Sequence, residues 1–394
     1  MSAFFNLFYI YDPWLFHFFR MAFFTGMLAL LWLAYQAYKK NLPQGIIVPL
    51  DSLWVILGLI GISIIPVLLH GTKELGVIIM YCKTLILFVF GVGIYNIFYR
   101  RPNGQALVVR DLKIGIAVQA GIGVVALAGL SFMIDLALWT NAVLPERFYG
   151  SEQEYRLYNI TSSAFFQLSV FYIVLLHFLL AYNAKHNNIN SVFLFLLLFI
   201  GLVSGRTFLF LSVVSIALYF KWRYIPALLA FAAICLFLAM NFADNKYVEH
   251  ALEPLINLLS NKGSISSSSD NLVKNHLYLP QLKQILIGDG YYYTPTGGYY
   301  GATDSGFIRQ ALYGGIGYMA ACFLFMFYFV RRIAQNWFDG SWTFTLSTLF
   351  ILSVLNIKAD TYAFPGLMLV LVMFLSLFGT HGKSKLFFES KRAV

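Results

Sequence analysis

Residues 191–220 read SVFLFLLLFIGLVSGRTFLFLSVVSIALYF, two apolar runs that meet at Gly205-Arg206. Arg206 is the only charged residue in this stretch. A helix needs about 20 mostly apolar residues to span a bilayer, and each run here is somewhat shorter. The stretch therefore predicts a tight hairpin of two short membrane helices, 190–204 and 207–220, with an arginine at its turn.

The composition extends this conclusion to the whole chain. Hydrophobic residues make up 60% of the sequence and charged residues 11%, whereas a soluble domain carries roughly 25% charged residues. Nine further apolar runs are expected to span the bilayer: 20–38, 53–70, 75–98, 113–139, 162–182, 224–242, 307–330, 342–357 and 361–380. The expected fold is an all-α polytopic membrane protein of about eleven transmembrane helices, forming a single integral membrane domain over residues 1–394. Residues 3–19, interrupted by Asp12-Pro13, are expected to lie at the interface; alternatively, they supply a twelfth span.

The distribution of charge predicts the orientation, because short cytoplasmic loops carry an excess of Lys and Arg. One set of alternate connections holds most of the cations: 39–40, 100–113, 185, 221–223, 331–332 and the C-terminal 383–392. The opposite set holds most of the acids: 71–74, 140–161, the turn at Arg206, 243–306 and 358–360. We therefore expect a cytoplasmic C-terminus and an acid-rich outer face. The net charge of +10 follows from the cytoplasmic loops, so no nucleic acid partner is expected.

The segment 243–306 is the longest that is not expected to span the membrane. Apolar residues at helical spacing predict two amphipathic helices on the membrane surface, one at 248–259 and one at 279–286. The sequence NKGSISSSSD at 261–270 is a polar linker between them. The stretch GDGYYYTPTGGYYGATDSG at 288–306 then leads into the next membrane helix.

Three charged residues on the outer face have both a structural and a functional explanation. Arg206 is costly in hydrocarbon, so it either snorkels from the hairpin turn or binds an anionic ligand. Asp304 precedes the run 307–330, where it either caps the helix or takes part in chemistry. Arg309 lies inside that run, where capping cannot explain it, and therefore needs an anionic partner from the protein or from a ligand.

Further candidates belong to the same face. Lys358 either forms a simple salt bridge with Asp360 or contributes to an anion site. Arg147 and Arg156 share the loop 140–161 with glutamates, and mutual ion pairing is the ordinary explanation for them. His276 is either an interfacial side chain or an acid–base group. Together these cations suit a ligand that carries a phosphate or diphosphate.

Other features of the sequence add constraints. Tyrosines at 291–293, 299 and 300 suit either sugar rings or an ordinary interfacial belt. Cys82, Cys235 and Cys322 lie inside apolar runs, and no two histidines have metal-ligand spacing, so neither a disulfide framework nor a metal or other cofactor is expected. The sequon at 159–161 (Asn-Ile-Thr) is interpreted as a chance match.

These features resemble the Wzy-type O-antigen and capsular polysaccharide polymerases, and the related O-antigen ligases, of bacterial envelopes. The resemblance rests on the many-helix hydropathy, the hairpin with SGRT at 204–207, the large loop in the second half, and GDG followed by TDSGFIRQALYGGIGY at 288–318. It covers the whole chain in architecture, whereas the motifs match at those two stretches.

The resemblance implies a membrane glycosyltransferase of lipopolysaccharide biosynthesis that needs neither metal nor nucleotide. It implies an inner-membrane location, with 243–306 as a periplasmic loop and the active site facing the periplasm. The donor would be an oligosaccharide linked to undecaprenyl diphosphate, and a chain-length regulator and a flippase would be partners. Arg206 falls at the family's diphosphate-binding position and Asp304 at the position that activates the acceptor hydroxyl. Arg309 has no motif equivalent.

Alternatives to the polymerase remain open. The ligases of this group often carry histidine at the position of Asp304, so the aspartate favours a polymerase over an O-antigen ligase. A transporter or flippase would show repeated halves and midplane charges; no internal repeat is found, and midplane charges are few, with Asp135 and Lys83 as the main candidates, both near span ends. A membrane acyltransferase would place a catalytic histidine beside an acid, and no such pair stands out in the sequence.

Overall fold

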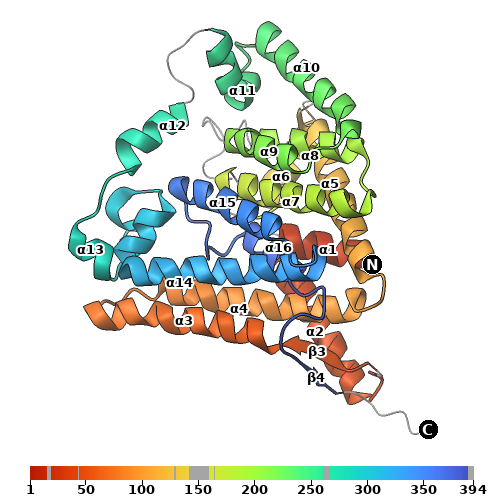
Figure 1. Ribbon diagram of the computed structural model, residues 1–394, viewed down its shortest axis with the longest axis vertical. Helices are drawn as coiled ribbons and strands as arrows, with labels where there is room; N and C mark the ends of the chain where they lie inside the picture. Colours follow the sequence, from red (N-terminus) through yellow and green to blue (C-terminus); the bar gives the residue numbers. More distant parts are fainter. Residues whose placement is uncertain are drawn as a thin grey trace. The chain divides into compact units, whose positions relative to one another are not determined.

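The computed structural model describes residues 1–15, 19–42, 44–127, 130–141, 159–163, 165–260 and 267–388, and most of them are helical (Figure 1). The first half contains α1 (Ser2–Tyr11), α2 (Met21–Tyr38), α3 (Leu50–His70), α4 (Gly76–Ile94), α5 (Gly104–Leu127), α6 (Ser131–Trp139) and α7 (Phe165–His186). The second half contains α8 (Ser191–Ser204), α9 (Arg206–Leu218), α10 (Ile225–Asn241), α11 (Lys246–Leu259), α12 (Ser267–Asn271), α13 (Leu282–Ile287), α14 (Gly306–Trp337), α15 (Trp342–Lys358) and α16 (Leu367–Leu375). Short strands pair β1 (Trp14–Leu15) with β2 (Phe19–Arg20) and β3 (Ile46–Pro49) with β4 (Ser384–Phe387), both antiparallel.

Within the described residues, six helical segments are long and apolar enough to cross a membrane: α2, α3, α4 with its π-helical end to Tyr99, α7, α10 with the preceding turn from Trp222, and α14. Three shorter apolar helices are α8, α9 and α15. The chain is therefore a helical membrane protein, as its composition predicts. Helix α1 is only ten residues long and is not among these segments.

Two of the expected spans are not continuous helices. In place of one helix over 113–139, α5 ends at Leu127 and α6 begins at Ser131, with an extended backbone at Leu130 (φ −75°, ψ 101°). In place of one helix over 361–380, α16 covers nine residues from Leu367 to Leu375. Proline lacks an N–H and disfavours helix in the residue before it, so Pro365 delays the start of this helix.

The chain divides into two compact units. Unit 1 comprises Met1–Leu28, Phe98–Ser266 and Gly366–Leu371; unit 2 comprises Ala29–Ile97, Ser267–Pro365 and Val372–Val394. In unit 1, α7 packs against α8 and α9, α1 against α5, and α10 against α11. The SGRT hairpin forms as expected, since α8 and α9 are separated by Gly205 alone and Gly201 packs on the ring of Phe208.

The first predicted amphipathic helix is present as α11. Its N-terminus is capped by Asn245, whose side chain accepts from the backbone N–H groups of Tyr247 and Val248. Leu252 and Ile256 from its apolar face are buried against α10. The second is shorter than expected, because α13 spans six residues, and part of the expected linker forms α12.

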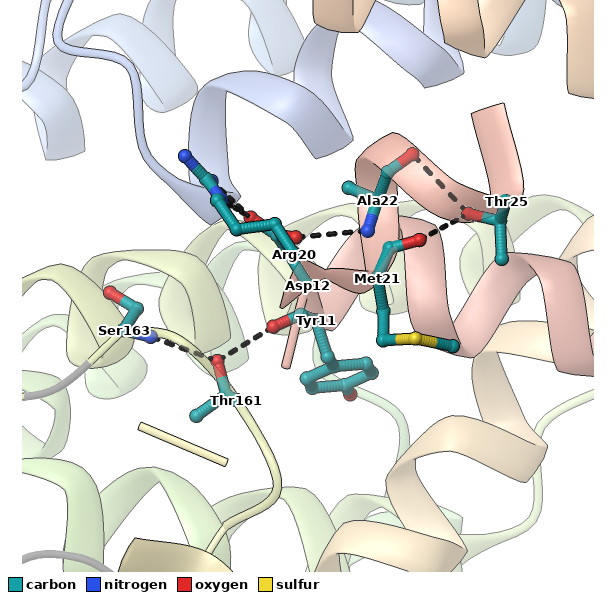
Figure 2. A network of polar contacts seen from close by, with 8 residues as sticks. All are labelled: Tyr11, Asp12, Arg20, Met21, Ala22, Thr25, Thr161 and Ser163. Atoms are coloured by element: carbon teal, nitrogen blue, oxygen red, sulfur yellow. Dashed lines mark hydrogen bonds and ion pairs between the residues drawn. The ribbon is translucent and has the colours of Figure 1, made fainter. Parts of the chain in front are cut away.

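A polar network holds the N-terminal turn of unit 1, where Asp12 adopts the left-handed conformation (φ 44°) (Figure 2). The buried Asp12 carboxylate forms an ion pair with Arg20 and accepts from the backbone N–H of Ala22 at 2.9 Å, at the start of α2. Thr161 Oγ1 donates to the Tyr11 carbonyl at 2.9 Å. The Asp12-Pro13 interruption is thus a turn whose acid caps the next helix. The same network buries Thr161 of the sequon, in keeping with a chance match.

In unit 2, α14 packs against α3, α13 and α15, and α3 packs against α4 (Figure 1). Two groups of connections gather at opposite ends of these helices. At one end, the side chains of His70 and Thr72 contact the carbonyls of Ile287 (3.1 Å) and Gly290 (3.0 Å). At the other end, the Asp51 carboxylate accepts from Arg332 Nη1 at 2.6 Å and from the backbone N–H of Lys383 at 3.0 Å, beside the β3–β4 pair.

Candidate active site

A break in helix α14 frees backbone carbonyls that bind the loop beside the candidate site. The helix is interrupted at Gly314-Gly315, where Gly315 has φ +69°. The carbonyls of Leu312 and Tyr313 accept instead from the backbone N–H groups of Asp289 (2.6 Å) and Gly290 (3.0 Å). The backbone of the GDG segment at 288–290 therefore supplies donors to the carbonyls left free by the break in the helix, and the glycines allow this close approach. This arrangement fixes the loop 288–305 against the first two turns of α14.

A buried aspartate lies at the centre of this end of unit 2. Asp360, 2% exposed, follows α15 and accepts hydrogen bonds from Tyr292 Oη at 2.6 Å, Gln310 Nε2 at 2.8 Å and the backbone N–H of Tyr362 at 3.2 Å. Burial raises the pKa of this carboxyl, while the charge of Arg309 and the hydrogen bonds oppose the rise. Asp360 and Arg309 thus interact through their charges and share Tyr292, whose hydroxyl donates to Asp360 and whose ring lies beside the guanidinium.

Arg309 is itself buried, at 2% exposure. Its guanidinium carbon lies 3.9 Å from the ring centroid of Tyr299 and 5.2 Å from that of Tyr292. A desolvated contact of this kind is worth about 2 kcal/mol. Its Nε and Nη1 atoms are buried and have no hydrogen-bond partner among the described residues. Arg309 was expected to need a partner, and Asp360 with the rings of Tyr292 and Tyr299 partly fills that need. Its Nε and Nη1 donors remain without a partner among the described residues.

The segment Tyr291–Tyr300, here called the tyrosine hairpin, covers Arg309. Tyr293 and Tyr299 form an antiparallel bridge with their rings stacked at 5.8 Å, and the Thr294 N–H donates to the Gly298 carbonyl at 2.8 Å. Its tip at Gly297 has φ +83° and open space around it. Tyr292 donates to Asp360, Tyr293 lies beside Gly76 of α4, and the ring of Tyr299 lies on Arg309, so exposing Arg309 would require these contacts to break.

Asp304 lies at the edge of this site, with a side chain that is 54% exposed. The N-cap residue of α14 is Ser305, so capping does not explain Asp304. Its carboxylate lies 3.8 Å from His276 Nε2, and the Thr303 hydroxyl donates to the His276 carbonyl at 2.6 Å. The acid–histidine pair that the sequence did not reveal is therefore present, formed across the loop by residues 28 positions apart.

The remaining predicted residues fall elsewhere. Lys358 ends α15 and is half-buried two residues from Asp360. Arg206, in unit 1, forms an ion pair with Glu253 of α11, so its turn is held by a protein carboxylate. Arg147 and Arg156 lie outside the described residues.

Asp360, Tyr292 and Asn356 were missed as site residues. Asp360 appeared in the sequence as the partner in a surface salt bridge, and Tyr292 as one tyrosine of several. The sequence did contain one signal for Asp360. Together with Lys358 it forms a charged pair directly before the last apolar run, 361–380, and Pro365 disfavours helix at the start of that run. Only tertiary packing, in which Gly306 lies against Asn356 and the backbone of Asp360, brings these residues to Arg309.

The unsatisfied atoms indicate what this arrangement binds. Asn356 Nδ2 joins Arg309 Nε and Nη1 as a buried donor without a partner among the described residues. Each such group costs about 1–3 kcal/mol. A ligand rich in acceptors, such as a phosphate, would satisfy them with charge-assisted hydrogen bonds. Among the described residues, no group of three or more His, Cys, Asp or Glu side chains is arranged to hold a metal ion.

Comparison with protein-family models, with curated proteins and with solved structures finds no match for this chain.

Proposed function

We propose that the protein polymerises lipid-linked polysaccharide repeat units, transferring glycan from undecaprenyl diphosphate to a sugar hydroxyl of another lipid-linked unit. The observation that carries the proposal is the buried Arg309, whose Nε and Nη1 atoms have no hydrogen-bond partner among the described residues, at the end of unit 2 that also presents the exposed Asp304. A diphosphate leaving group needs such donors, because negative charge builds on it as the glycosidic bond breaks. This reaction would use neither a metal nor a nucleotide.

The chemistry follows from the positions of the charged groups. The acceptor hydroxyl oxygen attacks the anomeric carbon of the donor, a new C–O bond forms, and the bond from that carbon to the diphosphate oxygen breaks. The hydroxyl proton passes to the Asp304 carboxylate, or to His276 beside it. Arg309 stabilises the departing undecaprenyl diphosphate. Lys358 is close in sequence to Asp360 and is proposed as a second cation at this end.

Substrate access would require the tyrosine hairpin to move, because it covers Arg309. Tyr299 occupies a face of the guanidinium, and its ring would be displaced or shared when the diphosphate binds. The other tyrosines of the hairpin then offer flat rings and hydroxyls to the sugars. In this proposal the site faces the periplasm from the inner membrane, the C-terminus is cytoplasmic, about eleven helices span the bilayer, and a flippase supplies the substrate.

One observation favours a second candidate, the O-antigen ligase. Ligases of the group that the sequence resembles often carry histidine where this chain has Asp304, and His276 lies 3.8 Å from that carboxylate. The acceptor distinguishes the two reactions, since a ligase would transfer finished glycan to lipid A core.

The test uses cells in which a variant is the only copy of the protein, with surface polysaccharide separated by length. Asp304→Asn and Arg309→Met should each abolish long glycan chains while membrane insertion is retained. Lys73→Gln, an exposed cation in the short α3–α4 connection, is the control and should leave chain lengths unchanged. Normal chain lengths in the Asp304 and Arg309 variants would refute the proposed site. Loss of glycan attachment to lipid A core with normal polymer length would identify the ligase.

A further inference from the structure

An apolar groove lies at the end of unit 2 opposite the candidate active site. It encloses about 470 Å³ and is lined by α2, β3, α4, the start of α3 and Phe388, with apolar side chains throughout. Sites for small molecules usually enclose roughly 300–1,000 Å³. The groove is therefore large enough for part of a lipid chain. The apolar surface of a membrane protein is surrounded by lipid, so lipid chains are the molecules available to fill it.

Three lysines lie at the edge of this groove. Tyr38 lines it, and the exposed Lys39 and Lys40 follow directly at the end of α2. Val48 also lines it and is paired with Lys385 across the β3–β4 ladder. Directly paired residues of an antiparallel ladder point to the same face, so the Lys385 side chain projects on the groove side.

Among the described residues, the neighbouring acid does not neutralise these lysines. Asp51, at the start of α3, is already paired with Arg332 and accepts from the Lys383 backbone. Lys39 and Lys385 instead rest against rings, with their Nζ atoms 5.9 Å from Tyr35 and 5.2 Å from Phe387. An apolar groove with three exposed cations at its rim is complementary to a molecule with an apolar chain and an anionic head.

We infer that this groove binds an anionic phospholipid, with an acyl chain against α2 and α4 and its phosphate at Lys39, Lys40 and Lys385. The β3–β4 pair forms one wall of the site, because Ile46 and Val48 line it and Phe388 follows β4. Strand β4 therefore contributes to the lipid site through Lys385, and Phe388 directly after it lines the groove. This inference does not depend on the proposed function, since the groove and Arg309 lie at opposite ends of unit 2.

The experiment is photolabelling of the full-length protein in nanodiscs of neutral phosphatidylcholine. A trace of phosphatidylglycerol with a diazirine on its acyl chain is added, and the labelled peptides are mapped by mass spectrometry. Label should concentrate on the groove residues of α2, α4 and β3, and phosphatidylcholine with the same diazirine should label them several-fold less. Because each lysine near an anionic lipid contributes about a fivefold preference, Lys39→Gln/Lys40→Gln/Lys385→Gln should lower phosphatidylglycerol labelling at least fivefold.

The matched control removes equal charge from the other end of unit 2, in Lys73→Gln/Lys274→Gln/Lys283→Gln, and should leave labelling unchanged. Thermal unfolding of both triple variants checks that they fold. If the first triple variant is unfolded, Ala37→Phe, which fills the groove without changing charge, should remove the label instead. Equal labelling by the two lipids, or unchanged labelling in a folded first triple variant, would overturn the inference. Stronger competition by an undecaprenyl phosphate than by phosphatidylglycerol would also overturn it.

Discussion

The buried pair of Arg309 and Asp360 gives the most quantitative prediction. Asp360→Asn keeps the shape of the side chain and an acceptor for Gln310, removes the charge, and requires the Tyr292 hydroxyl to accept from the new amide instead of donating. Arginine stays protonated, and the guanidinium would be left buried without a counter-ion. Breaking one partner of a buried ion pair typically costs about 3–5 kcal/mol; because Asp360 and Arg309 interact through their charges and through Tyr292, we expect a loss toward the lower end of that range for Asp360→Asn.

Arg309→Met should cost less. Asp360 can take up a proton when its partner is removed, since burial already raises its pKa. The main loss is then the contact with Tyr299, worth about 2 kcal/mol. The double variant leaves no charge unpaired, so its cost should fall below the sum of the single variants by about 2 kcal/mol or more.

The assay is equilibrium unfolding in mixed micelles with increasing SDS. Arg331→Met is the matched control, because Arg331 stacks on Trp342 at 4.0 Å toward the other end of α14. Its cost should add to that of Asp360→Asn within about 0.5 kcal/mol. The two residues are not coupled if the double variant Arg309→Met/Asp360→Asn loses the sum of the two single losses in unfolding free energy. They are also not coupled if Asp360→Asn alone has no cost.

Three further predictions concern the same unit. Tyr299→Ala should destabilise the protein by about 2 kcal/mol and Tyr299→Phe by far less, because the ring makes the contact with Arg309; SDS unfolding measures both, and equal losses would contradict the stacking. Gly315→Ala should cost at least about 2 kcal/mol, because its φ is +69° and a Cβ would lie 2.3 Å from the Leu286 carbonyl oxygen. The control Gly317→Ala, at a position with open space, should be nearly neutral in the same assay. Asp51→Ala should speed proteolysis of residues 383–388, because its carboxylate holds the Lys383 backbone; an unchanged digestion rate would argue against that role.

The sequence predicted those parts of the fold that depend on local pattern. Apolar runs of sufficient length located α2, α3, α4, α7, α10 and α14, and helical spacing located α11. It was wrong where local side-chain hydrogen bonds and Pro365 interrupt the helix pattern. The segment after Asp360 is apolar enough to suggest a helix from 361, yet Thr361 and Tyr362 are drawn into hydrogen bonds with Asn356 and Asp360.

The candidate site was predictable by residue type but not by arrangement. The cost of burying a charge pointed to Arg309, and the structure supplies the compensating acid from 51 residues away, at Asp360. Nothing in local spacing distinguishes Asp360 from an acid in a solvated loop. The pairing of Asp304 with His276 likewise depends on how α12 and the loop return to α14. For Arg206 the structural explanation has gained weight, since Glu253 neutralises it.

The central claim is that Arg309 and Asp304 serve glycan transfer from a lipid diphosphate. The most direct measurement reconstitutes the purified protein in liposomes with an undecaprenyl-diphosphate-linked oligosaccharide and follows product length and released undecaprenyl diphosphate by mass spectrometry. We predict products of two or more repeat units, one undecaprenyl diphosphate released for each bond formed, and neither from Arg309→Met or Asp304→Asn. Absence of product from the folded wild-type protein, or equal product from both variants, would contradict the account.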